Sequence, residues 1–271
     1  MTPTPLVVTA DDFGLTDGTS KAIVHAHLAG IVTATSVLAV APKAAERMRL
    51  LGDAPDLSVG VHLAAVGEDP PLLSAREIPT LVDRSGHLRS GWRSLVAHLA
   101  VGRVDPDDLR REFDAQIHLV SADLAPTHLD THQHLHLWPT VAGVVIDLAL
   151  QHGITAVRVP RSTGAGPRAR GIARLADRLA ATAGAAGLST TERFRGLDEA
   201  GGWNAPKLVD ALEELATGTG TVEINLHPGP ATDHERDRFG WGYRWSDELA
   251  AATDPRVREA IGRLGFDLVG R

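Results

Sequence analysis

Short runs of β-branched and apolar residues recur along the chain and alternate with stretches of helical character. Such runs are too short for helices and have the composition of buried strands. Parallel strands need a crossover between them, so this alternation is typical of a parallel α/β protein. The predicted strands are residues 6–9, 31–40, 57–62, 127–131, 156–159, 221–226 and 266–269.

Helical stretches occupy the intervals, and Asp17 and Asn204 are predicted N-caps for two of them. Residues 66–90 and 228–245 lack periodicity and are predicted loops, and loops of that length are usually functional. The predicted helices are residues 17–29, 42–51, 92–101, 106–122, 139–151, 167–187 and 204–216, followed by two that Ser246 and Asp254 would cap.

The length of 271 residues suits one large domain. Neither a G-x-G-x-x-G motif after the first run nor a P-loop is present in the sequence, so an open nucleotide-binding sheet is not favoured. We therefore predict an α/β fold of the TIM-like (β/α) barrel type, regular or irregular, with seven or eight strands. A single domain would span residues 1–271.

The chain has 13 histidines and no cysteine, which excludes disulfides and thiolate zinc sites. Any metal must therefore bind nitrogen and oxygen ligands. A net charge of −7 argues against a nucleic-acid partner. The N-terminus has neither the basic nor the apolar segment of a signal peptide, and no apolar run is long enough for a membrane span, so we expect a cytoplasmic protein.

Polar side chains follow four of the predicted strands. Asp11 and Asp12 follow the first strand, and His62 ends the third. The fourth continues into residues 128–136, which hold five histidines or carboxylates at alternate positions, and a later strand ends at His227. Sites in parallel α/β proteins form at the carboxyl ends of strands, so we expect these groups to converge.

Each of these groups also has a plainer explanation. The Asp pair could be a solvated turn, His62 a hydrogen-bonded core histidine, and His227 part of a strand-terminating turn. A carboxylate with two imidazoles, however, is an open site that suits Zn²⁺, Mg²⁺, Mn²⁺, Co²⁺ or Fe²⁺. On an extended strand, the alternate residues of the fourth run would project to one side, although the strand should end near His132 and not all of them should reach one ion. These residues are His128, Asp130, His132, His134 and His136.

Five blocks of the chain resemble the YdjC family, which includes ChbG-type chitooligosaccharide deacetylases and hopanoid-associated HpnK-type proteins. The Asp-Asp-Phe-Gly block and the His-Leu-Asp-x-His-x-His block are the most specific, whereas residues 163–202 match less clearly. The matched blocks are TADDFGL (9–15), GIVTATS (30–36), GVHL (60–63), PTHLDTHQH (126–134) and HPG (227–229).

The resemblance implies a (β/α) barrel-like carbohydrate N-deacetylase that uses one divalent metal ion, with Mg²⁺ or Zn²⁺ as the first choices. By motif position, Asp12, His62 and His132 would be the metal ligands. Asp11 would be the general base, and His227 would be the general acid. The family also admits a homodimer.

Other polar and aromatic residues lie near the same strand ends. Asp130 has the parity either to orient a histidine of its own strand or to make a strand-end hydrogen bond. Arg158 could bind an anionic or hydroxyl-rich substrate, and His134 could contact substrate or support the ligands. The roles of His128 and His136 stay open. Four tryptophans could stack on sugar faces or pack in the core, namely Trp138, Trp203, Trp241 and Trp245.

The leading hypothesis is hydrolysis of an N-acetylated amino sugar, either chitooligosaccharide-like or linked to a glycolipid, to acetate and a free amine. Amide hydrolysis needs an activated water, a stabilised oxyanion and a proton for the leaving amine, and the groups above can supply them. One alternative is another barrel metallohydrolase, such as an amidohydrolase or a phosphoesterase. The other is a non-catalytic sugar-binding protein.

Overall fold

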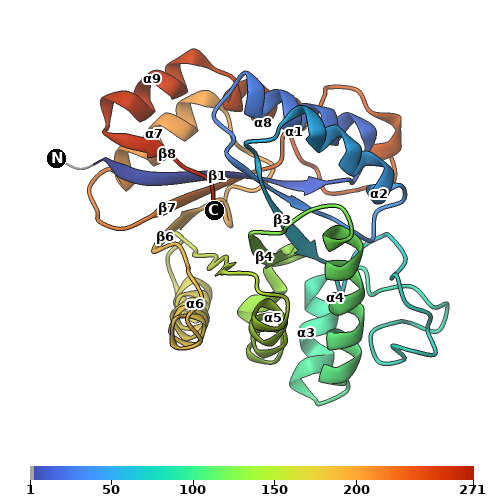
Figure 1. The fold of residues 1–271 in the computed structure, drawn as a ribbon. Helices are drawn as coiled ribbons and strands as arrows, with labels where there is room; N and C mark the ends of the chain where they lie inside the picture. Colours follow the sequence, from blue (N-terminus) through green and yellow to red (C-terminus); the bar gives the residue numbers. More distant parts are fainter. Residues whose placement is uncertain (1–2) are drawn as a thin grey trace.

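The computed structural model describes residues 3–271, and its centre is a curled sheet of parallel strands (Figure 1). The strand order is β5-β4-β3-β2-β1-β7-β6, and β8 pairs with β1 outside this path. The sheet forms a half-barrel, so the predicted TIM-like barrel is confirmed in an irregular form. The strands are β1 (Thr4–Phe13), β2 (Ala34–Val37), β3 (Ser58–Leu63), β4 (His128–Thr131), β5 (Ala156–Val157), β6 (Arg193–Arg195), β7 (Val222–Leu226) and β8 (Phe266–Leu268).

Helices cover the sheet on both sides. In the view of Figure 1, α3 to α6 lie below the strands, while α1 and α7 to α9 lie above them. Proline occupies the first turn of five helices, where its missing N–H breaks no helical hydrogen bond. The helices are α1 (Asp17–Leu28), α2 (Ala44–Arg47), α3 (Trp92–Ala100), α4 (Pro106–Ser121), α5 (Pro139–Gln151), α6 (Pro167–Ala185), α7 (Ala205–Leu215), α8 (Trp245–Ala252) and α9 (Pro255–Arg263), with 3₁₀ turns at Met48–Asp53, His132–Leu137 and His234–Arg236.

Most predicted elements are present, with ends that differ by a few residues. The N-cap of α1 is Thr16 rather than Asp17, because the Thr16 side chain accepts a hydrogen bond from the backbone of Thr19. Ser246 does not cap α8, which begins one residue earlier at Trp245. Residues 42–51 do not form one helix, because α2 gives way to a 3₁₀ turn. The strand β6 was not expected from the sequence.

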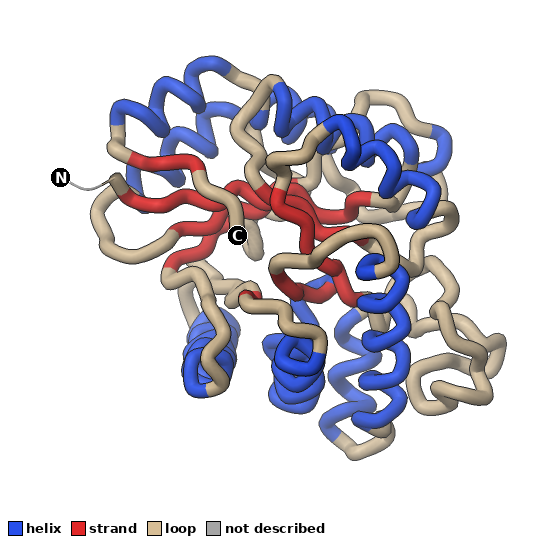
Figure 2. Tube along the Cα trace, in the orientation of Figure 1, coloured by secondary structure: helices blue, strands red, loops and turns tan. Residues whose placement is uncertain are grey.

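Two long loops lie side by side at the carboxyl ends of the strands. The connection at 64–91, part of the tan tube in Figure 2, is held by α4: Glu112 accepts hydrogen bonds from two backbone N–H groups of this connection. The aromatic loop 227–244 is tied to the same connection, since Trp241 Nε1 donates to Glu68 Oε1 at 2.9 Å. Arg238 also pairs with Asp69 across the two loops.

The strands β5 and β6 are the two edges of the half-barrel. The two edges do not pair directly among the described residues. At this seam between the edges, a parallel bridge joins Ala156 of β5 to Ser189, which precedes β6, and Val157 N donates to Ser189 O at 3.0 Å. Within residues 3–271, no helix combines the length and the apolar character that crossing a membrane requires.

Candidate metal centre and active-site cavity

Asp12 lies in an irregular stretch at the end of β1. The pairing of β1 with β2 shifts register between Ala10 and Phe13, as in a β-bulge. Asp12 there adopts a left-handed backbone conformation with a φ of 65°. This conformation is costly for a residue with a Cβ atom and is concentrated at functional sites. The two adjacent aspartates contact different partners.

His62 and His132 face the same carboxylate oxygen. His62 Nε2 lies 3.5 Å from Asp12 Oδ1, and His132 Nδ1 lies 3.6 Å from it. Ligands held tetrahedrally at about 2.0–2.1 Å from one ion are themselves about 3.4 Å apart. One ligand atom from each of the three residues lies within 4.8 Å of the other two. The spacing therefore fits a single shared ion.

Burial and charge also favour a cation at this point. Asp12 Oδ1 is buried and has no hydrogen-bond partner among the described residues, which is costly for a carboxylate unless a positive charge lies beside it. Burial alone would raise the pKa of Asp12, but His132 and His62 lower it overall. Burial alone would lower the pKa of His62, but the surrounding carboxylates, Asp130 first among them, raise it to about 9. One carboxylate and two imidazoles are a donor set that fits a divalent metal.

Asp130 holds the ring of His62 in place. Its Oδ1 lies 2.5 Å from His62 Nδ1, and its Oδ2 accepts a hydrogen bond from Ser36 Oγ at 2.9 Å. A hydrogen bond at Nδ1 leaves Nε2 of His62 free to face Asp12. A carboxylate behind a metal-ligating histidine is the usual arrangement that fixes the ring and its tautomer. The histidine that Asp130 contacts lies on the neighbouring strand β3 and not on its own strand β4, so the partner differs from the one expected from the sequence.

Arg158 lies beneath the cavity rather than in its lining. Its two terminal nitrogens each lie 2.7 Å from one oxygen of Asp11, and its Nε lies 2.9 Å from Glu223 Oε1. The side chain is completely buried, so it has no surface left for a substrate. Burial alone would raise the pKa of Asp11, but the ion pair with Arg158 lowers it well below its usual range. Asp11 is therefore an anion at any pH near neutrality.

His227 follows the last residue of β7 and is positioned by Glu248 of α8. His227 N donates to Glu248 Oε2 at 2.5 Å, and its Nδ1 lies 3.8 Å from the same oxygen. Burial alone would lower the pKa of His227, but Glu248 raises it overall. A histidine with a raised pKa keeps its proton to a higher pH than an ordinary histidine, and the protonated form is the one that an acid catalyst needs.

The five residues to which the resemblance gives roles border one cavity of about 350 Å³. Their positions come from the ends of β1, β3, β4 and β7, so the expected convergence at the carboxyl ends of the strands is found. These residues are Asp11, Asp12, His62, His132 and His227.

Further residues of the lining did not emerge from the sequence. Tyr243 belongs to the aromatic loop, and its ring centroid lies 4.8 Å from that of His227. The spacing of aromatic residues in Phe-Gly-Trp-Gly-Tyr was the signal that could have identified it. Trp92, Gln133 and Arg168 also border the cavity. Arg168 stands at the start of a long alanine-rich helix, where nothing in the local sequence distinguishes it from surface arginines.

The four tryptophans occupy different environments. Trp241 lines the cavity, with its ring centroid 5.2 Å from that of His132. Trp203 is completely buried and donates from Nε1 to Asn225 O at 2.9 Å, so it packs in the core and cannot stack on a sugar. Trp245 packs against Arg236. Trp138 lines a neighbouring cavity instead of this one.

The histidines after β4 do not continue on one side of a strand. Gln133 and His134 adopt left-handed conformations with φ of 55° and 53°, which turn the chain into a 3₁₀ segment. His134 borders the cavity. His136 is buried and contacts Thr131 Oγ1 at 2.6 Å, so it supports the turn. His128 lies in β4 and is fully buried.

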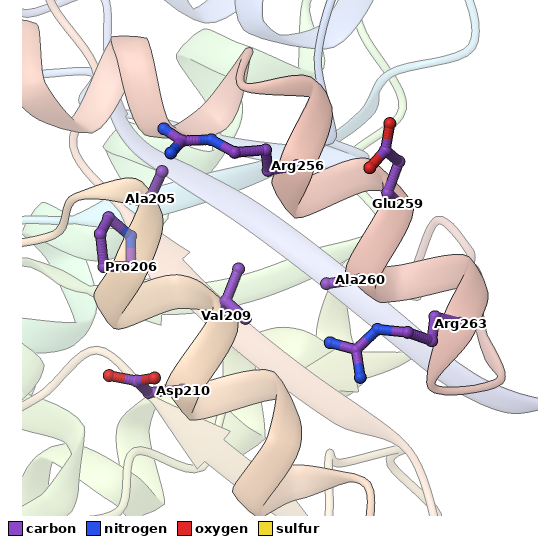
Figure 3. Close-up of a pocket in the computed structure, with 8 residues that line it drawn as sticks. All are labelled: Ala205, Pro206, Val209, Asp210, Arg256, Glu259, Ala260 and Arg263. Carbon is purple, nitrogen blue, oxygen red and sulfur yellow. The ribbon is translucent and has the colours of Figure 1, made fainter.

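A larger groove of about 550 Å³ lies between α7 and α9 (Figure 3). Its two arginines already have acidic partners, since Arg256 pairs with Asp254 and Arg263 with Glu213. The eight lining residues include no histidine, so the groove has no donor set like that around Asp12. The smaller cavity at the strand ends is the one that carries a candidate chemistry.

Comparisons with known proteins identify the family of the chain. The sequence model of the family described as YdjC-like protein matches residues 5–263. A human carbohydrate deacetylase is 33% identical, with 97% of this chain and 88% of that protein covered. A carbohydrate deacetylase of Brevibacillus brevis is also 33% identical, with 97% of each chain covered. A crystal structure of an Enterococcus faecalis protein, provisionally described as a cellobiose-phosphate cleavage protein, superposes with a TM-score of 0.82 at 25% identity over 99% of this chain and 98% of that one.

Proposed function

The chain belongs to the YdjC-like protein family, and on this premise we propose that it is a metal-dependent carbohydrate N-deacetylase. It would hydrolyse the acetamide of an N-acetylated amino sugar to acetate and a free amine. Relatives named carbohydrate deacetylase and, at 28% identity, a Yersinia pestis chitooligosaccharide deacetylase support this class of reaction. The metal requirement rests on this chain's own residues.

One observation carries the proposal. A buried carboxylate oxygen of Asp12 without a hydrogen-bond partner faces two imidazole nitrogens at 3.5 and 3.6 Å, in the same cavity as a paired aspartate and a histidine with a raised pKa. Asp12, His62 and His132 would hold the ion. A divalent ion bound there would supply Lewis acidity that polarises the substrate carbonyl and acidifies a water molecule.

The other residues would handle protons. Asp11 is held as an anion by Arg158 and would accept the proton of the attacking water. An aspartate in a bidentate ion pair is a weak base, so it depends on a water that is already acidified. His227 would donate a proton to the leaving nitrogen, and Glu248 would keep it protonated. Asp130 would hold His62 in the orientation that presents Nε2.

Acetate release tests the reaction. The protein is treated with a chelator, and Mg²⁺, Zn²⁺, Mn²⁺ or Co²⁺ is added back before incubation with a panel of N-acetylated amino sugars and chitooligosaccharides. We expect acetate and free amine in equal amounts, lost with the chelator and restored by at least one ion. Phosphate release from sugar phosphates without acetate release would instead favour the phosphoesterase alternative. Binding of the sugars without turnover would favour a sugar-binding protein.

Two kinds of variant separate the proposed roles. Asp11→Asn should lower kcat by about 10² or more while metal content stays near that of the wild type, because Asp11 acts on the proton and not on the ion. His62→Ala and His132→Ala should lose the metal itself. Full activity of Asp11→Asn would refute its role as the base, and undiminished metal in both histidine variants would refute the ligand set.

A further inference from the structure

A second cavity of about 210 Å³ adjoins the active-site cavity. The two share five lining residues, so they lie side by side. The shared boundary includes a hydrogen bond from Trp92 N to Gln133 Oε1 at 2.8 Å, which joins the start of α3 to the segment after His132. The shared residues are Trp92, Gln133, His134, Arg168 and Leu197.

Beyond this shared boundary, every lining residue is apolar. The walls are two helices, α3 and α6, and the remaining residues come from the segment that leads into α5. On α6, Ile172 and Leu175 follow Arg168 at the spacing that places residues on one helix face. The residues that line only this cavity are Val96, Leu135, Leu137, Trp138, Ile172 and Leu175.

Such a lining discriminates between occupants. A further sugar unit would bring several hydroxyl groups against side chains that offer no partner except the Trp138 indole N–H, and unpartnered buried hydroxyls are costly. An alkyl chain or an aromatic ring would instead remove apolar surface from water on both sides of the contact. Leaving the cavity without an occupant keeps Trp92, which is 41% exposed, in contact with solvent.

We propose that this cavity is an apolar subsite and that the substrate carries an apolar group attached to its amino sugar. This inference rests on the proposed deacetylase function and adds the class of substituent. At roughly 30 Å³ for a unit the size of a water or a methylene, the cavity holds about seven such units, or one aromatic ring. The group is attached either at the glycosidic oxygen or at the acyl carbon of the amide, and the experiment separates these two sources.

The test compares short and long substituents on one sugar. The substrates are the methyl, octyl and phenyl glycosides of N-acetylglucosamine, and the methyl glycoside of N-octanoylglucosamine, with release of free amine as the readout below any micelle concentration. Burial of even two methylene groups changes affinity by about tenfold, so we expect KM to fall at least about tenfold in one of the two long-chain arms. The long-chain substrate with the lower KM identifies whether the apolar group is attached at the glycosidic oxygen or at the acyl carbon.

Variants in the cavity wall locate the effect. Ile172→Phe, which fills the cavity, and Leu175→Asn, which makes its wall polar, should bring the KM ratio between long and short substrates back toward one. Leu150→Asn is the matched control, because Leu150 is an exposed leucine of α5 outside both linings. A ratio that is unchanged by both wall variants would refute this cavity as the subsite.

The failures of the two proposals are distinguishable. If the methyl glycoside is deacetylated and neither long chain lowers KM, the apolar subsite is wrong and the deacetylase proposal stands. If no substrate is turned over, the deacetylase proposal fails, and tryptophan fluorescence still tests the cavity through Trp92 and Trp138. A spectral shift with the octyl glycoside or with the N-octanoyl sugar, but not with the methyl glycoside of N-acetylglucosamine, would support the subsite. Equal spectra with all three would refute it.

Discussion

Asp11 and Asp12 are neighbours in the chain, yet they serve different partners. Asp12 has a left-handed backbone and faces two imidazoles, whereas Asp11 is bound by Arg158 through both oxygens. The sequence identifies both carboxylates as unusual at a strand end. It does not identify Arg158 as the partner of Asp11, because 147 positions separate them and an arginine after a strand has the same local pattern whether it faces substrate or core.

Histidine spacing is informative only as far as the strand extends. The alternation in residues 128–136 predicts a shared side, and this holds within β4. Gln133 and His134 then turn the backbone left-handed, so His132 and His136 end in different environments. Two consecutive non-glycine residues in that conformation have no reliable signature in local sequence, since tertiary contacts stabilise it.

Because His128 is buried in its neutral form, we expect the stability of the fold to decrease in acid. Burial first, and then the charge of Arg271, lower its pKa from 6.5 to about 3. Between pH 6.5 and about pH 3 the unfolded chain binds a proton at His128 that the folded chain does not bind. The free energy of unfolding is therefore unaffected by protonation of His128 above pH 6.5 and decreases as the pH falls below that value. His128→Gln should reduce the slope of unfolding free energy against pH, by up to about 1.4 kcal/mol per pH unit between pH 4 and 6.

Urea unfolding at several pH values, followed by circular dichroism, measures this slope. His234→Gln is the control, because the side chain of His234 is 94% exposed. The role assigned to His128 is incorrect if both variants show the wild-type slope.

At the scale of elements, periodicity and caps predict long helices well and short strands poorly. The limits of α5 agree with the predicted 139–151, since Pro139 begins it and an apolar pattern continues to its end. The strand β6 has only three residues, Arg193–Arg195, and two of them are charged, so no alternation marks it. It exists because β7 offers a free edge to pair with.

Close contact between β3 and β4 depends on a glycine. A Cβ atom on Gly60 would lie 2.5 Å from His128 Cε1, so close that either strand β3 or the His128 side chain would have to move. We expect Gly60→Ala to destabilise the fold by about 1–3 kcal/mol through overpacking, measured by chemical denaturation. In a His128→Ala background the ring is gone, so the added cost of Gly60→Ala should be smaller. An equal cost in both backgrounds would show that the ring is not the cause.

The whole molecule holds a group of buried charged residues within a largely apolar core. Glu223 connects two arginines inside the half-barrel: Arg158, which holds Asp11, and Arg271, whose guanidinium contacts the second oxygen of Glu223. Arg271 N also donates to Ser58 Oγ at 3.0 Å. Charged residues from β1, β7, the position after β5 and the end of the chain therefore meet in one ion-pair network, and Ser58 of β3 contacts the backbone of Arg271. Its members are far apart in sequence, so no local pattern predicts it.

Removal of Arg271 should be costly. Its side chain is only 4% exposed, and Arg271→Ala would leave Glu223, which is completely buried, with one cation instead of two. Loss of one partner of a buried pair typically costs about 3–5 kcal/mol, and we expect the lower part of that range because Arg158 stays. Arg263→Ala breaks an exposed pair with Glu213 and should cost less than about 1 kcal/mol. Thermal and urea unfolding measure both losses of stability. If Arg271→Ala and Arg263→Ala were equally destabilising, the proposed importance of the buried ion pairs would be contradicted.

The residues proposed for chemistry and the helix α6, which lines the apolar cavity, come from different parts of the molecule, relative to the seam between β5 and β6. The groups proposed for metal binding and proton transfer come from β1, β3, β4 and β7, strands that lie together in the continuous part of the sheet. The walls of the neighbouring apolar cavity include α6, which lies in the chain between β5 and β6. Within residues 3–271 one isolated bridge, between Ala156 and Ser189, joins β5 to the segment before β6, so few ladder contacts hold this part of the chain to the sheet. We therefore expect changes in this segment to alter the proposed substrate preference while the residues proposed for hydrolysis keep their positions.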